Sequence, residues 1–476
     1  MNKRILRLAL PNIITNITVP LLGMVDMVVV GHLSASHIGA ITIGSSIFNL
    51  IYWNFGFLRM GTSGFAAQAY GAQDFKESVR IFVRSIAVAF SIALLLLVLQ
   101  WPISQLSLAI FEGSDEVLQM ALTYFFIRIW AAPATLGNYA VKGWFIGMQD
   151  SKTPMWIAIM LNIVNIVCSL LFVMVFHWDI AGVALGTVIA QYSGFVVGVT
   201  LVFVRRGRLF RAYADGVVRL DSEGRVEVSG DASSIAWRQI ISDSLHWREM
   251  RRFFKVNADI FLRTVCLSLV FTFITAASGR ISDEVLAIDA LLLQFFMLFS
   301  YIMDGFAYAG ESLVGRYIGA RDGASLRLSV RLLLLWGVGL TLAFTVLYAL
   351  FGEQFLRLFS SDNGLIAASR QYLFWVLIIP VCGFAAFLFD GIFVGATASK
   401  VMRNSMFFAT IAFFVVYFGG KYLFQQLSQY SPDGILPPLS SAVQNNILWT
   451  AFMVYLIMRG LLQAVALKRS VYSQAA

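Results

Sequence analysis

The sequence predicts an all-α integral membrane protein in which twelve transmembrane helices form two parallel six-helix repeats. Of its 476 residues, 59% are hydrophobic and only 13% are charged, and the mean hydropathy is +0.78. Soluble domains carry about 25% charged residues, so this chain cannot cover a water-facing surface. Apolar runs close to the ~20 residues that cross a bilayer recur along its whole length.

An internal duplication is the second observation. The loop at residues 71–74 (GAQD) resembles the loop at 319–322 (GARD), and the segment 143–147 (GWFIG) resembles 391–395 (GIFVG). Both matches have the same offset of 248 residues, which is close to half of the chain. Because chance rarely keeps one offset across separate loops and helices, the sequence indicates two copies of one unit.

Each copy is expected to contain six spans. The first span follows the N-terminus without a small-residue cleavage pattern, so we expect it to be retained rather than removed as a signal peptide. We predict an N-terminal lobe at 1–206, an inter-lobe linker at 207–248 and a C-terminal lobe at 249–476. The expected spans are 4–31, 37–70, 76–103, 116–147, 153–177, 180–206, 249–279, 284–316, 325–350, 366–396, 403–425 and 443–468.

The distribution of Lys and Arg predicts the orientation. Basic residues concentrate in alternate loops and near both termini, the pattern of cytoplasmic segments under the positive-inside rule. The net charge of +9 therefore reflects topology, and no nucleic-acid partner is expected. With six spans each, both halves enter from the cytoplasm, so the repeats are parallel and related by an axis along the membrane normal. We expect a multi-pass protein of the plasma (inner) membrane.

Ionisable groups inside spans are costly and mark candidate functional sites. Asp26 lies in the outer part of the first span, after Pro11 and Pro20. Each proline removes a backbone donor and clashes with the preceding turn, so we expect this helix to be bent. The alternative is a hydrated, merely structural Asp26 near the outer surface.

Neutral oxygen donors occur in two other spans of the first half. Asn165 and Ser169 are four residues apart in the fifth span, and Thr187 lies in the sixth. Together with Asp26 they would suit a proton or a small hard cation such as Na⁺. Hydrogen bonding between helices is the competing role for Asn165 and Thr187.

Further charges occur within spans of both halves. Asp259 and Arg263 have the four-residue spacing of an ion pair within one helix. Arg59 must face the interior and neutralise a carboxylate that the sequence does not identify. Asp390 occupies the position that Lys142 has in the first repeat. The candidate cavity charges are Arg59, Asp259, Arg263, Asp304, Glu311 and Asp390.

The sequence lacks common motifs of nucleotide binding and of hydrolysis. It has no Walker loop, no HExxH and no GxSxG, so neither ATP-driven transport nor hydrolysis is indicated. The three cysteines have no paired spacing, so neither a disulfide framework nor a metal site is predicted. We expect no enzyme activity, no cofactor and no bound metal beyond a coupling ion.

Several segments resemble a known family. Residues 24–33 (MVDMVVVGHL) resemble the first-span motif of the multidrug and toxic compound extrusion (MATE) transporters. Other segments resemble the DNA-damage-inducible F (DinF) subfamily of these transporters: 57–62 (FLRMGT), 143–150 (GWFIGMQD), 304–308 (DGFAY) and 390–397 (DGIFVGAT). The resemblance extends over nearly the whole chain.

This resemblance implies an antiporter whose N- and C-lobes surround a central V-shaped cavity. Members export amphipathic, often cationic drugs or metabolites in exchange for H⁺ or Na⁺. The coupling site of the subfamily corresponds to Asp26, Asn165 and Thr187. Many relatives have a second aspartate where this chain has Ser169, and losing that carboxylate weakens a Na⁺ site more than a proton site. We therefore expect H⁺ coupling, with Na⁺ as the alternative.

Two other functions remain open. A flippase for lipid-linked or amphipathic substrates would line its cavity with several basic residues, and only Arg59, Lys142 and Arg263 qualify. A non-transport membrane assembly subunit would need a large soluble surface for its partner, which the sequence lacks. The expected partners are thus a small amphipathic substrate, the coupling ion and membrane lipids, and the expected state is a monomer.

Overall fold

A computed structural model describes most of the chain. It describes all residues except 32–33, 111–113, 212, 214–216, 221–225, 230–235, 430–439 and 476. For residues 19–31, 35, 110, 217–220, 226–229 and 429 it describes the backbone alone.

The N-terminal lobe consists of helices. They are α1 (Asn2–Gly31), α2 (Ala35–Asn54), α3 (Phe57–Gly71), α4 (Phe75–Val98), α5 (Gln100–Ile110), α6 (Asp115–Arg128), α7 (Ala132–Gly147), α8 (Lys152–Leu170) and α9 (Asp179–Arg211). A 3₁₀ turn, Ile129–Ala131, joins α6 to α7, and a π-helical turn, Leu171–Val175, extends α8.

The linker and the C-terminal lobe follow. The linker contains a small antiparallel hairpin, β1 (Val217–Leu220) and β2 (Val226–Ser229), which pairs Val217 with Ser229, and the short helix α10 (Trp237–Ser244). The second lobe contains α11 (Trp247–Ile281), α12 (Asp283–Gly319), α13 (Gly323–Phe359), α14 (Asn363–Ser369), a 3₁₀ turn at Arg370–Tyr372, α15 (Leu373–Gly395), α16 (Ser399–Gln429), α17 (Ser441–Ser470) and a 3₁₀ turn at Tyr472–Ala475.

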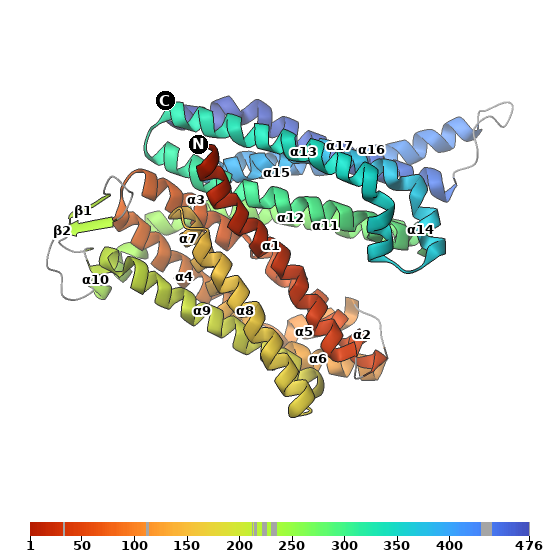
Figure 1. The fold of residues 1–476 in the computed structure, drawn as a ribbon, viewed down its shortest axis with the longest axis horizontal. Coiled ribbons are helices and arrows are strands. Elements are labelled where there is room, and N and C mark those ends of the chain that lie inside the picture. The colour runs from red at the N-terminus through yellow and green to blue at the C-terminus, as the bar shows by residue number, and fades with distance from the viewer. Residues whose placement is uncertain are drawn as a thin grey trace.

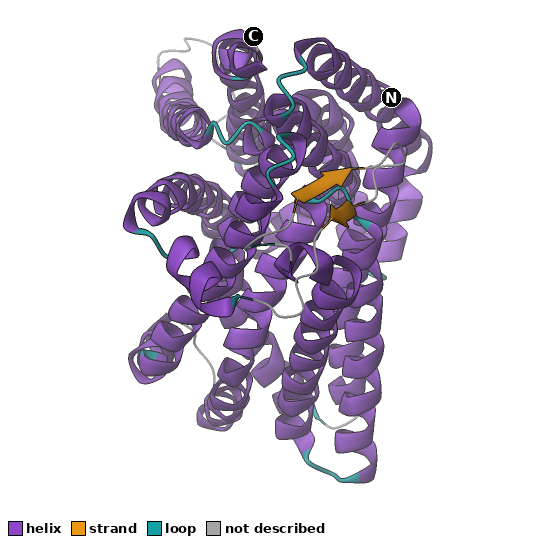
Figure 2. Cartoon of the chain, turned by 90° about the vertical axis from the view of Figure 1, so that its left-hand side faces the viewer, coloured by secondary structure: helices purple, strands orange, loops and turns teal. Residues whose placement is uncertain are grey.

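The helices confirm the predicted membrane fold. Within the described residues, eleven helical segments are long and apolar enough to cross a membrane. Helix α1, 30 residues long, matches the remaining predicted span. The third predicted span is shorter than expected, because α4 ends at Val98 and α5 begins a separate helix. Figure 2 shows how completely helices dominate the molecule.

The helices form two lobes arranged as a V (Figure 1). Both termini, the hairpin and α10 lie at one end of the molecule, which we call the linker end. The lobes meet there and diverge towards the opposite, far end. Each lobe has its own apolar core, built around aromatic side chains such as Phe48 and Trp144 in the first and Phe295 and Phe452 in the second.

Contacts between the lobes repeat in pairs. A Cβ at Gly71 would lie 1.9 Å from the carbonyl oxygen of Arg316, and a Cβ at Gly319 would lie 2.0 Å from that of Gln68. Gly71 corresponds to Gly319 and Gln68 to Arg316 in the 248-residue repeat, so one contact is made twice. Such reciprocity is the signature of a two-fold interface. The two glycines let the backbones of α3 and α12 touch at the linker end.

A hydrogen bond marks the pseudo-two-fold axis itself. Ser63 on α3 donates to Glu311 on α12 over 2.6 Å, and the two residues are 248 positions apart. A residue that contacts its own repeat counterpart must lie at the axis that relates the repeats. Because both termini and the linker lie at one end of the molecule, each repeat begins and finishes there, and the predicted parallel arrangement is confirmed (Figure 1).

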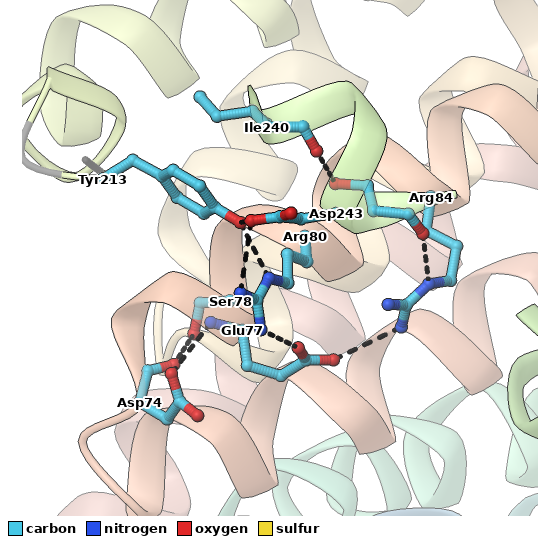
Figure 3. A network of polar contacts seen from close by, with 9 residues as sticks. Asp74, Glu77, Ser78, Arg80, Arg84, Tyr213, Ile240 and Asp243 are labelled. Atoms are coloured by element: carbon cyan, nitrogen blue, oxygen red, sulfur yellow. Dashed lines mark hydrogen bonds and ion pairs between the residues drawn. The ribbon is translucent and has the colours of Figure 1, made fainter. Parts of the chain in front are cut away.

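The linker is fastened to the first lobe by a polar network (Figure 3). Tyr213 donates to Asp243 of α10 over 2.7 Å and accepts a 2.7 Å hydrogen bond from Arg80 of α4. Arg84 donates to the carbonyl of Ser244 over 3.0 Å. Burial raises the pKa of Tyr213 to about 12, and the hydrogen bond from Tyr213 lowers the pKa of Asp243. Both groups therefore keep one protonation state across neutral pH, and α10 stays docked there.

The glycine contact at the linker end leads to a stability prediction. Gly319→Val places a side chain against the backbone of α3 and forces α3 and α12 apart. We expect the variant to lose about 1–3 kcal/mol of stability, as overpacked cores do. Denaturant unfolding of the purified protein in detergent measures the loss.

Gly339→Val is the matched control, because nothing lies within 4 Å of a Cβ at Gly339. Its effect should stay within about 0.5 kcal/mol. Equal effects of the two substitutions would contradict the close approach of α3 and α12.

Candidate functional site

A buried ion pair joins the two lobes. Arg59 on α3 contacts Glu311 on α12 through two hydrogen bonds of 3.0 and 3.2 Å. The guanidinium also lies 3.9 Å from the centre of the Tyr308 ring, within the range of a cation–π contact. Glu311 is only 2% exposed and is further bound by Ser63. Glu311 is thus the partner of Arg59 that the sequence left unnamed.

A second charge cluster lies within the C-lobe around Asp390 on α15. Arg263 on α11 and Arg459 on α17 both form ion pairs with this carboxylate, and Gln463 donates to it over 2.9 Å. Arg263 also contacts the Met60 sulfur on α3 at 3.9 Å, so the cluster reaches the first lobe. Arg459 and Gln463 were not among the site residues predicted from the sequence, although an arginine inside the twelfth predicted span was a visible signal.

The predicted ion pair within α11 is wrong. Asp259 pairs with Arg403 on α16 at 2.6 Å and accepts a 2.9 Å hydrogen bond from Ser399, while Arg263 pairs with Asp390. The four-residue spacing allows a pair on one helix, but neighbouring helices offer both residues better-placed partners. Asp259 and Arg263 therefore tie α11 to α16 and α15.

Two further charges are only half-buried. Asp304 on α12 accepts a 3.4 Å hydrogen bond from Ser300 on the preceding turn. Lys142 on α7 forms no ion pair with any described residue. Of the six candidate cavity charges, five are buried, and Asp304 is intermediate.

A cluster of neutral polar groups lies inside the first lobe. Asn165 on α8 donates to Thr187 on α9 over 3.0 Å, and Ser169 lies one turn further along α8. Asn165, Ser169 and Thr187 are all buried. Gly186 allows the close packing, since a Cβ there would lie 2.7 Å from the Ser169 hydroxyl. The structure thus brings together the three predicted neutral donors.

Two oxygen atoms of this cluster lack partners. The side-chain carbonyl of Asn165 and the hydroxyl of Ser169 form no hydrogen bond with the described residues. A buried polar atom without a partner costs about 1–3 kcal/mol, so this arrangement is incomplete as it stands. A π-helical turn begins two residues after Ser169, a feature that occurs frequently at functional sites.

Helix α1 contacts both lobes. Asn12 donates to Ser151 at the start of α8 over 3.0 Å, and Asn162 on α8 donates to the carbonyl of Thr18 over 3.0 Å. Towards the second lobe, Asn16 donates to the carbonyl of Tyr301 on α12 over 3.1 Å. The N-terminal turns of α1 also contribute Ile5 and Leu8 to the core of the second lobe.

The predicted bend in α1 is not tested by these contacts. Figure 1 draws α1 as one uninterrupted helix that passes through Pro11 and Pro20. Pro11 is buried. The side chains of Pro20 and Asp26 lie outside the described residues.

The described part of the chain contains no candidate metal site. There, no group of three or more His, Cys, Asp or Glu side chains could hold a metal ion.

Comparison with known proteins identifies the family. The MatE family model matches twice, over residues 11–171 and 260–422, once in each repeat. The chain is 35% identical to the DNA damage-inducible protein F of Escherichia coli K12, covering 98% of this chain and 92% of that protein. It is 23% identical to a probable multidrug resistance protein NorM of Photorhabdus laumondii, over 78% of this chain and 77% of that protein.

Solved structures agree in fold. A crystal structure of a MATE protein in the bent conformation matches with a TM-score of 0.78 at 19% identity, over 100% of this chain and 97% of that one. The chain belongs to the MATE family of multidrug and toxic compound efflux transporters and, within it, to the DinF subfamily.

The ion pair between the lobes gives a testable prediction. Arg59→Met leaves Glu311 buried and uncompensated, which typically costs about 3–5 kcal/mol. The double variant Arg59→Met/Glu311→Met removes both charges and should be less destabilised than the single one. Denaturant unfolding in detergent measures both.

The control is Arg357→Met, which breaks an exposed pair with Glu353 on one helix. Exposed pairs contribute about 1 kcal/mol or less. If Arg59→Met were as mild as Arg357→Met, the buried pair would not hold the lobes together.

Proposed function

We propose that this protein is a secondary active antiporter that exports lipophilic, often cationic compounds in exchange for protons. The observation that carries the proposal is the incomplete polar cluster of the first lobe. The Asn165 carbonyl and the Ser169 hydroxyl are buried without partners among the described residues, beside the hydrogen bond between Asn165 and Thr187. These oxygens are suited to a group that binds to them reversibly.

The register of α1 against α8 supports Asp26 as that group. The two contacts Asn12–Ser151 and Thr18–Asn162 show that the helices run in the same direction. Both helices rise about 1.5 Å per residue. Counting outward in equal steps brings Asp26 level with residue 165 of α8 from the first contact and with residue 170 from the second. The stretch between them contains Asn165 and Ser169.

The chemistry of the cluster favours a proton over Na⁺. Na⁺ prefers several oxygen ligands with negative charge among them. Asn165, Ser169 and Thr187 supply neutral oxygens only, so a single carboxylate, Asp26, would carry all the charge. One carboxylate is sufficient to bind and release a proton.

The contacts of α1 provide a route from proton binding to a change of shape. A proton on Asp26 removes the charge that the amide and hydroxyl groups of the cluster would solvate. Because α1 is held by α8 on one side and α12 on the other, any shift in its packing alters how the lobes meet. A ligand biases such an equilibrium by its differential affinity for the two states.

The remaining features of the proposal concern orientation and substrate. The basic loops favour cytoplasmic termini under the positive-inside rule, and with that orientation the far end would open outwards. The relative named NorM is described as a multidrug resistance protein. Three arginines at or near the lobe interface pair with two carboxylates, Glu311 and Asp390, and a third carboxylate, Asp304, interacts with the same arginines. This near balance of charge argues against the basic cavity of a flippase.

The central test is Asp26→Asn, which mimics the protonated aspartate at nearly constant volume. We expect efflux driven by a pH gradient in proteoliposomes to fall at least about tenfold, which corresponds to a coupling free energy above about 1.4 kcal/mol. Substrate binding should persist. Imposing pH and Na⁺ gradients separately identifies the ion.

Asp283→Asn at the exposed start of α12 serves as the control and should transport normally. Normal pumping by Asp26→Asn against a substrate gradient would show that coupling resides elsewhere.

A second prediction concerns ion choice. Ser169→Asp adds a carboxylate to the cluster and should make efflux respond to an imposed Na⁺ gradient, because two negative charges suit a hard cation. Ser169→Asn adds a neutral side chain of similar size and should not. If the Asp variant remained insensitive to Na⁺, the cluster would not be the ion-binding site.

A further inference from the structure

A fully buried carboxylate lies in the second lobe, apart from the residues considered so far. Asp289 is in the second turn of α12, near the far end, and is 1% exposed. The surrounding core contains Ile274 of α11, Ile288 and Leu292 of α12, and Phe452 of α17. An ionised carboxylate in such apolar surroundings is costly unless it is paired.

No cation neutralises Asp289 among the described residues. Glu311, Asp390 and Asp259, the other buried carboxylates discussed above, each pair with at least one arginine. Asp289 is instead held by neutral groups from two helices. Its Oδ1 accepts hydrogen bonds from Asn445 at 3.0 Å and from the Trp449 indole at 2.7 Å, and its Oδ2 contacts the hydroxyl of Ser278.

The protons around Ser278 allow two arrangements. A serine hydroxyl has one proton to donate, yet Ser278 lies within hydrogen-bond distance of both Asp289 Oδ2 and the carbonyl of Ile274, the latter at 2.8 Å. If Ser278 donates to Oδ2, the carboxylate is ionised and the Ile274 carbonyl loses this bond. If Ser278 donates to Ile274, the proton between Ser278 and Oδ2 belongs to Asp289.

The second arrangement satisfies both Asp289 oxygens, the Ser278 hydroxyl and the Ile274 carbonyl, although the side-chain carbonyl of Asn445 lacks a partner among the described residues. The protonated Oδ2 donates to the Ser278 oxygen, which donates in turn to Ile274. Oδ1 remains an acceptor throughout, because the Trp449 indole can only donate. The proton is therefore carried by Oδ2, and exchange between the two forms requires the arrival or departure of one proton together with rotation of the Ser278 hydroxyl.

We propose that Asp289 is a proton-binding site of the second lobe, with Ser278 as the group that follows its protonation. The donor set suits a proton and not a metal ion, since the Trp449 and Asn445 groups that face the carboxylate present N–H and no lone pair. Among the described residues, Tyr372 of the turn before α15 interacts electrostatically with Asp289, and Glu284 of α12 interacts in turn with Tyr372.

The internal repeat relates this site to the proposed coupling residue of the first lobe. At the 248-residue offset Asp26 corresponds to Ile274, whose carbonyl is the alternative acceptor for Ser278. Each lobe thus has a carboxylate near the far end. In the first lobe it is Asp26, on the first helix of the repeat. In the second lobe it is Asp289 on α12, which contacts Ser278 of α11 one turn after Ile274, the residue equivalent to Asp26. The use of this second proton in transport rests on the proposed H⁺ antiport, whereas proton binding itself does not.

Infrared difference spectroscopy of the purified protein in lipid nanodiscs tests proton binding directly. A protonated carboxylic acid gives a carbonyl band that the ionised form lacks. We expect such a band to titrate in the unmodified protein and to be lost in Asp289→Asn, whose amide can donate to Ser278 as the protonated acid does. Asp283→Asn, at the exposed start of the same helix, should retain the band.

Ser278→Ala provides a second readout that keeps Asp289. The ionised carboxylate then loses a stronger hydrogen bond than the protonated acid does, so the midpoint of the band should move to higher pH by on the order of one pH unit. Asp26 contributes a band of its own, so the decisive comparison is whether one band disappears in Asp289→Asn. Loss of no band in Asp289→Asn, or a midpoint that Ser278→Ala leaves in place, would overturn the proposal. Since no transport is measured, failure here leaves the proposed antiport standing, and failure of pH-driven efflux leaves proton binding by Asp289 standing.

Discussion

The backbone contact between α3 and α12 is the constraint on which the rest of the structure depends. Two glycines at equivalent positions of the repeat let these helices touch, and the contact joins the two lobes at the linker end. Because it lies at the pseudo-two-fold axis, it fixes both lobes at once. The Arg59–Glu311 pair lies on the same two helices and so joins the lobes beside their closest approach.

The buried charged and polar groups of the interior are of two kinds, with different consequences. Glu311, Asp390 and Asp259 are each bound by arginine, and these ion pairs hold helices together. Asp289 and the cluster around Asn165 and Ser169 lack a cationic partner in the described part of the chain. The first kind resists change, since breaking a buried pair is costly. A carboxylate of the second kind, such as Asp289, can take up a proton without leaving a buried cation unpaired, which suits a group that drives a transport cycle.

The sequence was sufficient to predict the membrane fold, the duplication and the approach of Asn165 to Thr187. These depend on hydropathy, on a fixed offset and on the family resemblance. The pairing of Asp259 was not predictable, because the four-residue spacing is compatible with a local pair and says nothing of Arg403 on another helix. Asp289 was not predicted for a similar reason. What distinguishes it is that no cation pairs with it among the described residues, and this follows only from the packing of α11, α12 and α17.

The position of α1 has a consequence for how the chain is assembled. Ile5 and Leu8 belong to the core of the second lobe, and α12 supplies much of their surroundings. During synthesis α1 enters the membrane long before α12 exists, so its N-terminal turns must face lipid or transient neighbours until the second repeat arrives. The first helix to be inserted is therefore among the last to reach its final packing, and the first repeat alone cannot complete its own structure.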